Sequence, residues 1–314
     1  MRMRWEGYEA IKLCAAGYTV MAVPELGAQV ISLEKNGVPL LHAPENRQAL
    51  EKASTSYGLP ILFPPNRIDG GHFQAGGREY DFPVNEAARG NSLHGFLHTR
   101  PWQVGEITEN TMTMQYEATE QSDFYAYYPH AFKAVLQYTL DEDGLHQLVT
   151  IENRSDRPMP VGLGFHSAFA VDAESRVRIS AGKRILMSER MLPTGEVRAL
   201  SEQEQRLRAE GLAATAWAMD DHYTAEPLAP SGFHGAVVER RKGRVFYEVD
   251  PFYQHWMIWN ANQEGSFICL EPQNWRVNAP NLAAQGVSDE ETGFCMLESG
   301  RSLQARARIW MENR

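Results

Sequence analysis

The sequence contains few cysteines. Only three occur among 314 residues, at positions 14, 269 and 295, and they are odd in number and widely spaced. This excludes a disulfide framework and any pair of cysteines spaced as zinc ligands. Cys269 and Cys295 lie within apolar stretches, where a free thiol behaves as a small core residue. We therefore expect reduced thiols and a cytoplasmic location.

Clusters of positive charge and long apolar runs are also absent. Asp and Glu number 40 against 30 Lys and Arg, which gives a formal charge of −10, and no Lys/Arg-rich run occurs. Nucleic acid and anionic membrane surfaces are therefore poor partners. The apolar runs fall far short of the roughly 18 residues that cross a bilayer. Residues 1–7 precede no apolar segment, so we expect no signal peptide.

The chain lacks the familiar motifs of nucleophilic and cofactor-dependent enzymes. It has no Gly-x-Ser-x-Gly elbow and no phosphate-binding Walker loop. The glycine pairs at 70–71 and 76–77 do not match a dinucleotide-binding fingerprint. The sequence therefore shows no motif for a nucleotide or dinucleotide cofactor.

Short stretches of alternating or β-branched residues, separated by Gly, Pro, Asn and Asp, dominate the chain. This pattern is typical of antiparallel strands with one buried face. The clearest stretches are residues 8–13, 18–23, 29–33, 111–116, 132–140, 146–153, 160–165, 236–239, 245–249, 255–259, 266–270 and 302–311. Residues 59–93 instead predict a long, irregular and functional loop. With no repeat and no linker, the sequence predicts one mainly antiparallel β domain, residues 1–314.

Local chemistry also places two hairpin turns and two short helices. Asn36-Gly37 suits a type I′ turn, in which both central residues have φ > 0, and residues 141–144 join two strands. Residues 44–53 are one helical candidate. Ser201 followed by Glu204 forms a capping box, which predicts a helix over residues 201–210.

Glu271 follows the apolar stretch 267–270 and precedes Pro272. Because proline lacks the amide hydrogen that a β ladder needs, we expect the strand to end here, with Glu271 at its junction with a loop. A partly desolvated carboxyl group has a raised pKa and suits proton transfer near neutral pH. A surface glutamate after a strand is the alternative.

Two of the ten histidines have unusual contexts. His94 precedes Gly95, which lets the backbone turn tightly around the imidazole. His166 follows the apolar stretch 160–165 at the end of a predicted strand. Two histidines and a carboxylate at strand ends indicate acid–base chemistry, although histidines that simply pack in the core are the alternative.

Arg67 and the pair Asp220-Asp221 are further polar groups near predicted loops. Arg67 either ties a loop together through backbone carbonyls or binds a substrate oxygen with its planar guanidinium group. Asp220 and Asp221 follow Trp217 at a predicted strand end. They form either an ordinary acidic turn or part of a site, and which of the two faces the site stays open.

Taken in order, these blocks resemble those of the aldose 1-epimerase (galactose mutarotase) family, over nearly the whole chain. The matching segments are 66–68 with Gly71, Phe73, Gly77, Tyr80 and Asn85, then 93–95 with Trp102, Asn153 with Pro160 and 164–169, 192–196 with 221–222, and 270–274. The resemblance implies a large antiparallel β-sandwich of the galactose mutarotase-like supersandwich type, with a few short helices. It also implies an isomerase that interconverts the α and β anomers of a hexose without a cofactor or metal.

By position, the resemblance implies a role for each site residue. Glu271 would be the general base that takes the proton from the anomeric hydroxyl, and His166 the general acid that protonates the ring oxygen. His94 would form a hydrogen bond near the ring oxygen or the C1 hydroxyl. The substrate contacts would come from Asn66, Arg67, Asp221, Trp275 and Arg276.

The segment after Glu271 departs from the family's pattern. Many members have Pro-Asp-Ala after the block that holds the catalytic base, whereas this chain has Arg276-Val-Asn278-Ala. Arg276 therefore leaves open an epimerase for a phosphorylated or acidic sugar. A non-catalytic carbohydrate-binding or sensing domain on the same scaffold is a second alternative. In each case we expect a small-molecule sugar as ligand and a monomer or homodimer.

Overall fold

The structure is a computed structural model that describes residues 1–313. Strands β13 (Phe132–Asp141) and β14 (Gly144–Asn153) illustrate how the sequence pattern builds it. Every second residue of β13 is buried, so one face of the strand joins the core and the other faces outward. The two strands pair from Asp141 opposite Gly144 onward, which confirms the hairpin predicted at 141–144.

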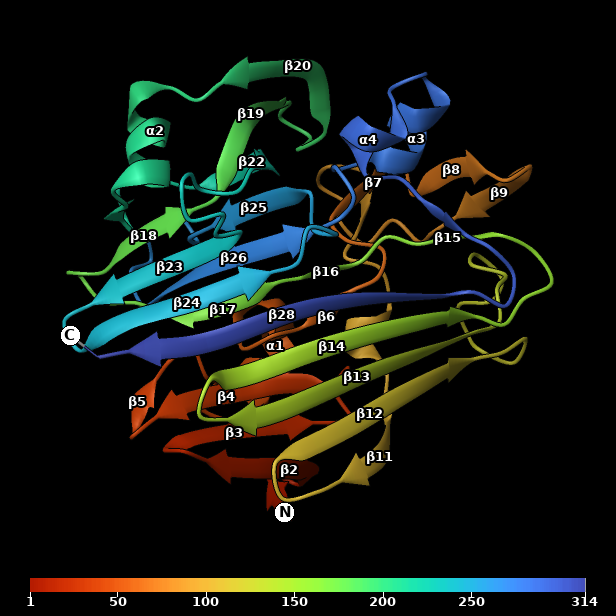
Figure 1. Ribbon diagram of the computed structural model, residues 1–314. Coiled ribbons are helices and arrows are strands. Elements are labelled where there is room, and N and C mark those ends of the chain that lie inside the picture. Colours follow the sequence, from red (N-terminus) through yellow and green to blue (C-terminus); the bar gives the residue numbers. More distant parts are fainter. Residues whose placement is uncertain (314) are drawn as a thin grey trace.

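β13 and β14 belong to a nine-stranded antiparallel sheet that forms one layer of the fold (Figure 1). In spatial order its strands are β11 (Gln103–Ile107), β12 (Thr111–Ala118), β13, β14, β28 (Ser302–Glu312), β24 (Gly243–Val249), β23 (Gly235–Arg240), β18 (Arg176–Ile179) and β21 (Leu212–Ala213).

The opposite layer contains two sheets. The eight-stranded sheet runs β20 (Pro193–Ala199), β19 (Ala181–Met187), β22 (Asp220–Ala225), β25 (His255–Trp259), β26 (Phe267–Gln273), β16 (Gly164–Phe165) and β6 (Ile61–Leu62), and β17 (Ser167–Ala170) also pairs with β26. The five-stranded sheet runs β1 (Arg2–Trp5), β2 (Tyr8–Ala15), β3 (Tyr18–Val23), β4 (Gln29–Lys35) and β5 (Val38–Pro39). Its strands β2 and β3 contact β12 and β13 of the first layer.

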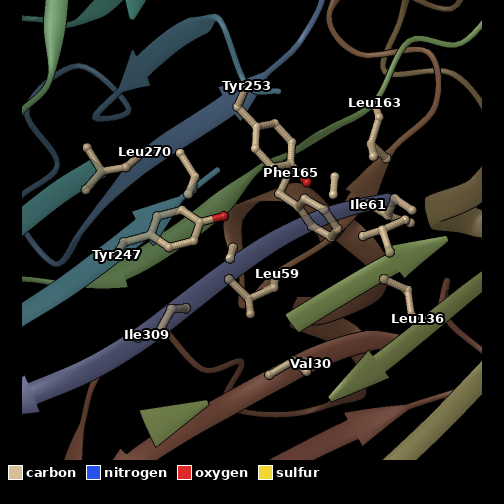
Figure 2. Packing of buried hydrophobic residues seen from close by; sticks show 14 of the residues in the cluster. Val30, Leu59, Ile61, Leu136, Leu163, Phe165, Tyr247, Tyr253, Leu270 and Ile309 are labelled. Atoms are coloured by element: carbon tan, nitrogen blue, oxygen red, sulfur yellow. The ribbon is translucent and has the colours of Figure 1, made fainter. Parts of the chain in front are cut away.

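The interior between these layers is one continuous apolar cluster. Figure 2 shows Val30 of β4, Leu136 of β13, Ile309 of β28 and Leu270 of β26 converging on it, and each is fully buried or nearly so. Because all three sheets contribute to the same core, the fold is an antiparallel β-sandwich. The predicted fold class, a mainly antiparallel β-sandwich with a few short helices, is confirmed.

Short two-stranded ribbons and short helices complete the fold. The two-stranded ribbons are β7 (Arg67–Asp69) with β10 (Asn91–Leu93), β8 (His72–Ala75) with β9 (Arg78–Asp81), and β15 (Met159–Pro160) with β27 (Met296–Leu297). The helices are α1 (Arg47–Lys52), α2 (Glu202–Ala209), α3 (Ala279–Ala284) and α4 (Asp289–Thr292), with the 3-10 turns η1 (Ser54–Ser56) and η2 (Leu97–Thr99). Within residues 1–313, none of these helices has the length and apolar character needed to cross a membrane.

Several local predictions are confirmed, and others are corrected. Asn36 and Gly37 both have positive φ, 50° and 75°, and join β4 to β5. Ser201 and Glu204 form the complete capping box of α2. The segment 59–93, predicted to be irregular, instead contains five short strands, β6 to β10. Helices α3 and α4 were not predicted, because each is only one to two turns long.

Candidate active site

Four side chains form a row across the outer face of the eight-stranded sheet, the face turned away from the sandwich core. His222 of β22 pairs with Met257 of β25, and Met257 pairs with Glu271 of β26. On the far side of β26, Gly164 pairs with Gln273 and Ser167 pairs with Leu270. The same register across the two positions between these pairs places His166 opposite Glu271. Residues directly opposite each other in an antiparallel sheet share a face, so this register sets Glu271 beside His166.

Pro272 does not end the strand, which corrects the sequence-based expectation. Strand β26 continues to Gln273, and Pro272 pairs with Trp256 of β25 on one side. On the other side no ladder pair forms at positions 271 and 272, between β16 and β17, because proline cannot donate an amide hydrogen there. Glu271 is therefore a buried strand residue at a local break in the sheet.

Glu271 and His166 interact directly. The Nε2 atom of His166 lies 3.1 Å from Oε1 of Glu271, and the two residues are 5% and 2% exposed. Burial, aided by the charge of Asp220, raises the pKa of Glu271 to about 8, although Arg67 opposes this. Burial lowers the pKa of His166 to about 3. Burial disfavours the charged form of each group. At pH values between about 3 and about 8, the pair therefore holds one proton.

His94 lies against this pair. Its imidazole meets that of His166 edge to face, with ring centroids 5.1 Å apart. Its backbone has φ 65° and its amide donates to the carbonyl of Asn66 at 2.8 Å. Gly95 follows with φ 63°, and a Cβ there would lie 1.9 Å from the carbonyl oxygen of Phe63, so only glycine fits. Burial holds the pKa of His94 well below its usual range, which leaves a neutral ring that can form hydrogen bonds.

Arg67 also lines the site, held by a carboxylate that the sequence reasoning missed. Its Nε and Nη2 atoms donate to the two oxygens of Glu86 at 2.8 and 2.9 Å, and Nη1 donates to Asn66 at 3.3 Å. Arg89 and Asn91 also donate to Glu86. Burial alone would raise the pKa of Glu86, but these donors lower it to about 2. The carboxylate thus fixes the plane of the Arg67 guanidinium group.

Asp220, and not Asp221, faces the site. Because successive side chains of a strand point to opposite faces, Asp220 of β22 shares the outer face with His222, whereas Asp221 points inward. There the Asp221 carboxylate accepts from Arg184 at 2.6 Å and from the indole of Trp217 at 2.7 Å. The placement of Asp221 among the substrate contacts is therefore corrected.

Trp275 and Arg276 likewise lie outside the site. Trp275 is 2% exposed and packs edge to face on Phe73, with ring centroids 6.4 Å apart. A Cβ on Gly162 would lie 2.5 Å from its ring, which shows how closely the indole is enclosed. Arg276 is buried, and its backbone amide donates to Thr292 of α4. Both residues are close to Glu271 in sequence, but neither side chain lies in the site that contains Glu271.

The site is a polar cavity of about 530 Å³ above three members of this row, His166, Glu271 and Met257. Its lining comprises Thr55, Asn66, Arg67, Arg89, Leu93, His94, His166, Ala218, Met219, Asp220, Met257, Trp259, Ala261, Asn262 and Glu271. Trp259 meets His166 edge to face, with centroids 5.8 Å apart, and provides an aromatic wall. Such a cavity, with several polar groups and one aromatic surface, suits a small polar ligand.

One wall of the cavity is a strained turn that the sequence did not reveal. Ala261, Asn262 and Gln263 have consecutive φ values of 46°, 58° and 66°, a left-handed conformation that costs free energy in residues with a Cβ. The buried side chain of Asn260 stabilises the turn, since its oxygen accepts from the amides of Gln263 and Met219. This turn places Asn262 at the cavity.

These groups can move protons but are not arranged as metal ligands. Glu271 and His166 form an acid–base pair, and His94 and Arg67 can donate hydrogen bonds to oxygen atoms beside it. No cluster of three or more His, Cys, Asp or Glu side chains suited to a metal ion occurs within residues 1–313.

Similar structures share this fold. The chain superposes over its whole length on 98% of a galactose mutarotase-like protein from Clostridium acetobutylicum, with a TM-score of 0.94 and 31% identity. A putative aldose 1-epimerase from Escherichia coli K12 has a TM-score of 0.81 at 18% identity and covers 97% of this chain and 99% of its own, which supports the fold alone.

Curated sequences give a consistent result. The galactose mutarotase of Mus musculus is 25% identical over 257 residues, 72% of this chain and 73% of that protein. The uncharacterized protein YihR of Escherichia coli K12 is 28% identical over 161 residues, so this chain spans about half of its length. The sequence profile described as aldose 1-epimerase matches residues 9–310. The chain therefore belongs to the aldose 1-epimerase family.

Proposed function

We propose that this protein is an aldose 1-epimerase that interconverts the α and β anomers of a free hexose. The observation that carries the proposal is the direct contact between Glu271 and His166 at the floor of a polar cavity large enough for a monosaccharide. Membership of the family and the mutarotase relative support the reaction class.

In the proposed mechanism, Glu271 as carboxylate takes the proton from the C1 hydroxyl. His166 as imidazolium gives its proton to the ring oxygen. The C1–O bond of the ring then breaks as C1 becomes an aldehyde, and rotation about C1–C2 followed by the reverse transfers gives the other anomer. Each positioned group contributes roughly 10²–10⁴-fold to the rate.

The shared proton makes these roles compatible. Ring opening converts a carboxylate and an imidazolium into a carboxylic acid and a neutral imidazole, so the pair holds one proton before and after the step. Ring closure reverses this. The contact of 3.1 Å also lets the proton pass directly between the two groups when the cavity holds no sugar. In the reactive form, His166 carries the proton and Glu271 is a carboxylate. Burial favours the form in which both groups are neutral, so the proton must first pass from Glu271 to His166.

His94 and Arg67 are proposed to stabilise the reacting oxygens, and Asp220 to accept from a sugar hydroxyl. Trp259 offers its ring to the apolar face of the sugar. The charges in and next to the cavity favour a neutral sugar, because Arg67 and Arg89 are offset by Glu86 and Asp220. Arg276, which suggested a phosphorylated sugar, does not line the cavity.

Polarimetry tests the proposal. Freshly dissolved α-glucose, α-galactose and glucose 6-phosphate are followed with and without the protein. We expect the optical rotation of at least one free hexose to reach equilibrium faster with the protein, and glucose 6-phosphate to gain no advantage over glucose. Sugar binding by calorimetry without any acceleration would instead support a non-catalytic carbohydrate-binding domain.

A further inference from the structure

A second polar cluster lies beside the active site on the same face of the eight-stranded sheet. His255 of β25 is paired with Gln273 of β26, two residues along each strand from Met257 and Glu271. His222, one strand away, has its ring centroid 5.4 Å from that of His255. Arg276 lies three residues after Gln273, and burial together with the charge of this guanidinium group lowers the pKa of both imidazoles.

The four side chains are deeply buried but poorly satisfied. His222 and Gln273 are fully buried, and His255 and Arg276 are 1% and 6% exposed. Within residues 1–313, no partner is present for either side-chain amide atom of Gln273, Nε2 of His222, or Nε and Nη2 of Arg276. The ring nitrogens of His255 form no hydrogen bond of good geometry, although the backbone of Tyr223 and Glu291 lies close to them. Buried polar atoms almost always have partners, so this concentration of unpartnered atoms points to a bound species.

The charge of the cluster indicates which species. The other buried guanidinium groups have acceptors: Glu86 accepts from Arg67, and the carbonyls of Pro39 and Ala170 accept from Arg240. Arg276 has no carboxylate within ion-pair distance among residues 1–313, and burial lowers its pKa although the more distant charge of Glu291 opposes this. Burial lowers the pKa of both imidazoles, so they are neutral and do not compensate its charge. A positive group in such a position is costly without a counter-ion.

The hydrogen-bonding groups of the cluster, like its positive charge, favour an anion. Arg276 and the amide nitrogen of Gln273 offer only donors, each neutral imidazole offers one donor, and the acceptors are fewer. A cation would be repelled by the guanidinium group, and water would satisfy the donors but leave the charge unbalanced. An anion accepts several N–H groups at once and provides the missing charge.

We infer that His222, His255, Gln273 and Arg276 form a binding site for a small monovalent inorganic anion such as chloride. The site is distinct from the sugar cavity, because none of these four residues lines that cavity. Met257 separates the two, with its sulfur 2.9 Å from Nδ1 of His222 on one side and its side chain in the cavity wall on the other. Leu192 and Val277 pack beside Met257 and help to close the region from solvent.

Halide-dependent unfolding tests the inference. The wild-type protein is unfolded thermally in sodium chloride, sodium bromide or sodium isethionate at equal ionic strength, because isethionate is too large for an enclosed site and is not a sugar. We expect chloride and bromide to stabilise the protein saturably. At ten times the dissociation constant, the unfolding equilibrium constant should fall about tenfold. The same dependence in isethionate, or no dependence on any of the three salts, would overturn the inference.

Two further measurements locate the effect. Arg276→Gln should lose the halide dependence, while Arg206→Gln, at an exposed position on α2, should keep it. If Arg276→Gln does not fold, diffraction from bromide-soaked wild-type crystals decides. An anomalous bromide peak within hydrogen-bond distance of Arg276 and Gln273 supports the site, and water alone at that position contradicts it. Neither measurement depends on catalytic activity, so the outcome is separate from that of the proposed function.

Discussion

Glu271 and His166 face each other across the one stretch of β26 where the ladder with β16 and β17 is interrupted, with Oε1 and Nε2 3.1 Å apart. Pro272 causes the interruption because it has no amide hydrogen. The register on both sides of the gap holds the two side chains on the same face. The sheet itself thus positions the acid–base pair, which a flexible loop would position less well.

The raised pKa of Glu271 predicts a stability effect that depends on pH. Its ordinary value of 4.5 is raised to about 8 in the folded protein by burial. Between these values the folded state binds the proton and the unfolded state does not, so the free energy of unfolding falls as pH rises from about 4.5 to about 8. Glutamine does not ionise, so the Glu271→Gln variant does not lose this part of the unfolding free energy as pH rises. We expect the variant to be more stable than wild type, with a difference in Tm that grows from pH 5 to pH 9.

Thermal unfolding by circular dichroism across this pH range provides the measurement. His166 acts with the opposite sign, because its pKa is lowered to about 3 and its effect appears between that value and its ordinary 6.5. A Tm difference between Glu271→Gln and wild type that did not change from pH 5 to pH 9 would show that Glu271 ionises normally.

Substitution of Asp220 should weaken substrate binding, whereas substitution of Asp221 should lower the stability of the protein. Asp221→Asn breaks the pair between buried Asp221 and partly buried Arg184, which costs up to roughly 3 kcal/mol of unfolding free energy. Asp220→Asn removes a hydrogen-bond acceptor from the cavity, which we expect to raise KM about tenfold with little change in stability. Urea unfolding and steady-state kinetics on both variants measure the two effects. The reverse pattern would place Asp221, and not Asp220, in the site.

Gly95→Ala should disturb His94 through the backbone. The added Cβ would lie 1.9 Å from the carbonyl oxygen of Phe63. The backbone must therefore shift, and a misplacement of about 1 Å costs roughly 10²-fold in rate. Gly77→Ala is a matched control, since Gly77 also has positive φ, 73°, but nothing lies within 4 Å of its Cβ position. The control should lose about 1 kcal/mol of stability and keep its kcat/KM. Equal kcat/KM values for both variants would exclude a positional role for Gly95.

The sequence predicted the sandwich because its strands alternate clearly. Residues 132–153 and 302–311 show which side chains face inward without further information. The prediction for Asp221 was wrong because a strand, β22, begins at Asp220 where a strand end was expected. Successive strand residues point to opposite faces, so an error of one residue selects the wrong aspartate. The prediction for Arg276 was also wrong, since the turn after β26 sends consecutive side chains in different directions. Glu86 and Asn262 reached the site through folding of distant loops, for which the sequence carries no periodic signal.

The central claim is that Glu271 takes part directly in exchanging the anomers of a sugar. Magnetisation-transfer NMR on an equilibrium mixture of α- and β-galactose or glucose measures that exchange for wild type, Glu271→Gln and Glu298→Gln. Glu298 is exposed and outside the cavity, so its variant is the matched control. We expect wild type and Glu298→Gln to catalyse the exchange, and folded Glu271→Gln to lose roughly 10²–10⁴-fold of the rate. Exchange at the wild-type rate in Glu271→Gln would contradict it.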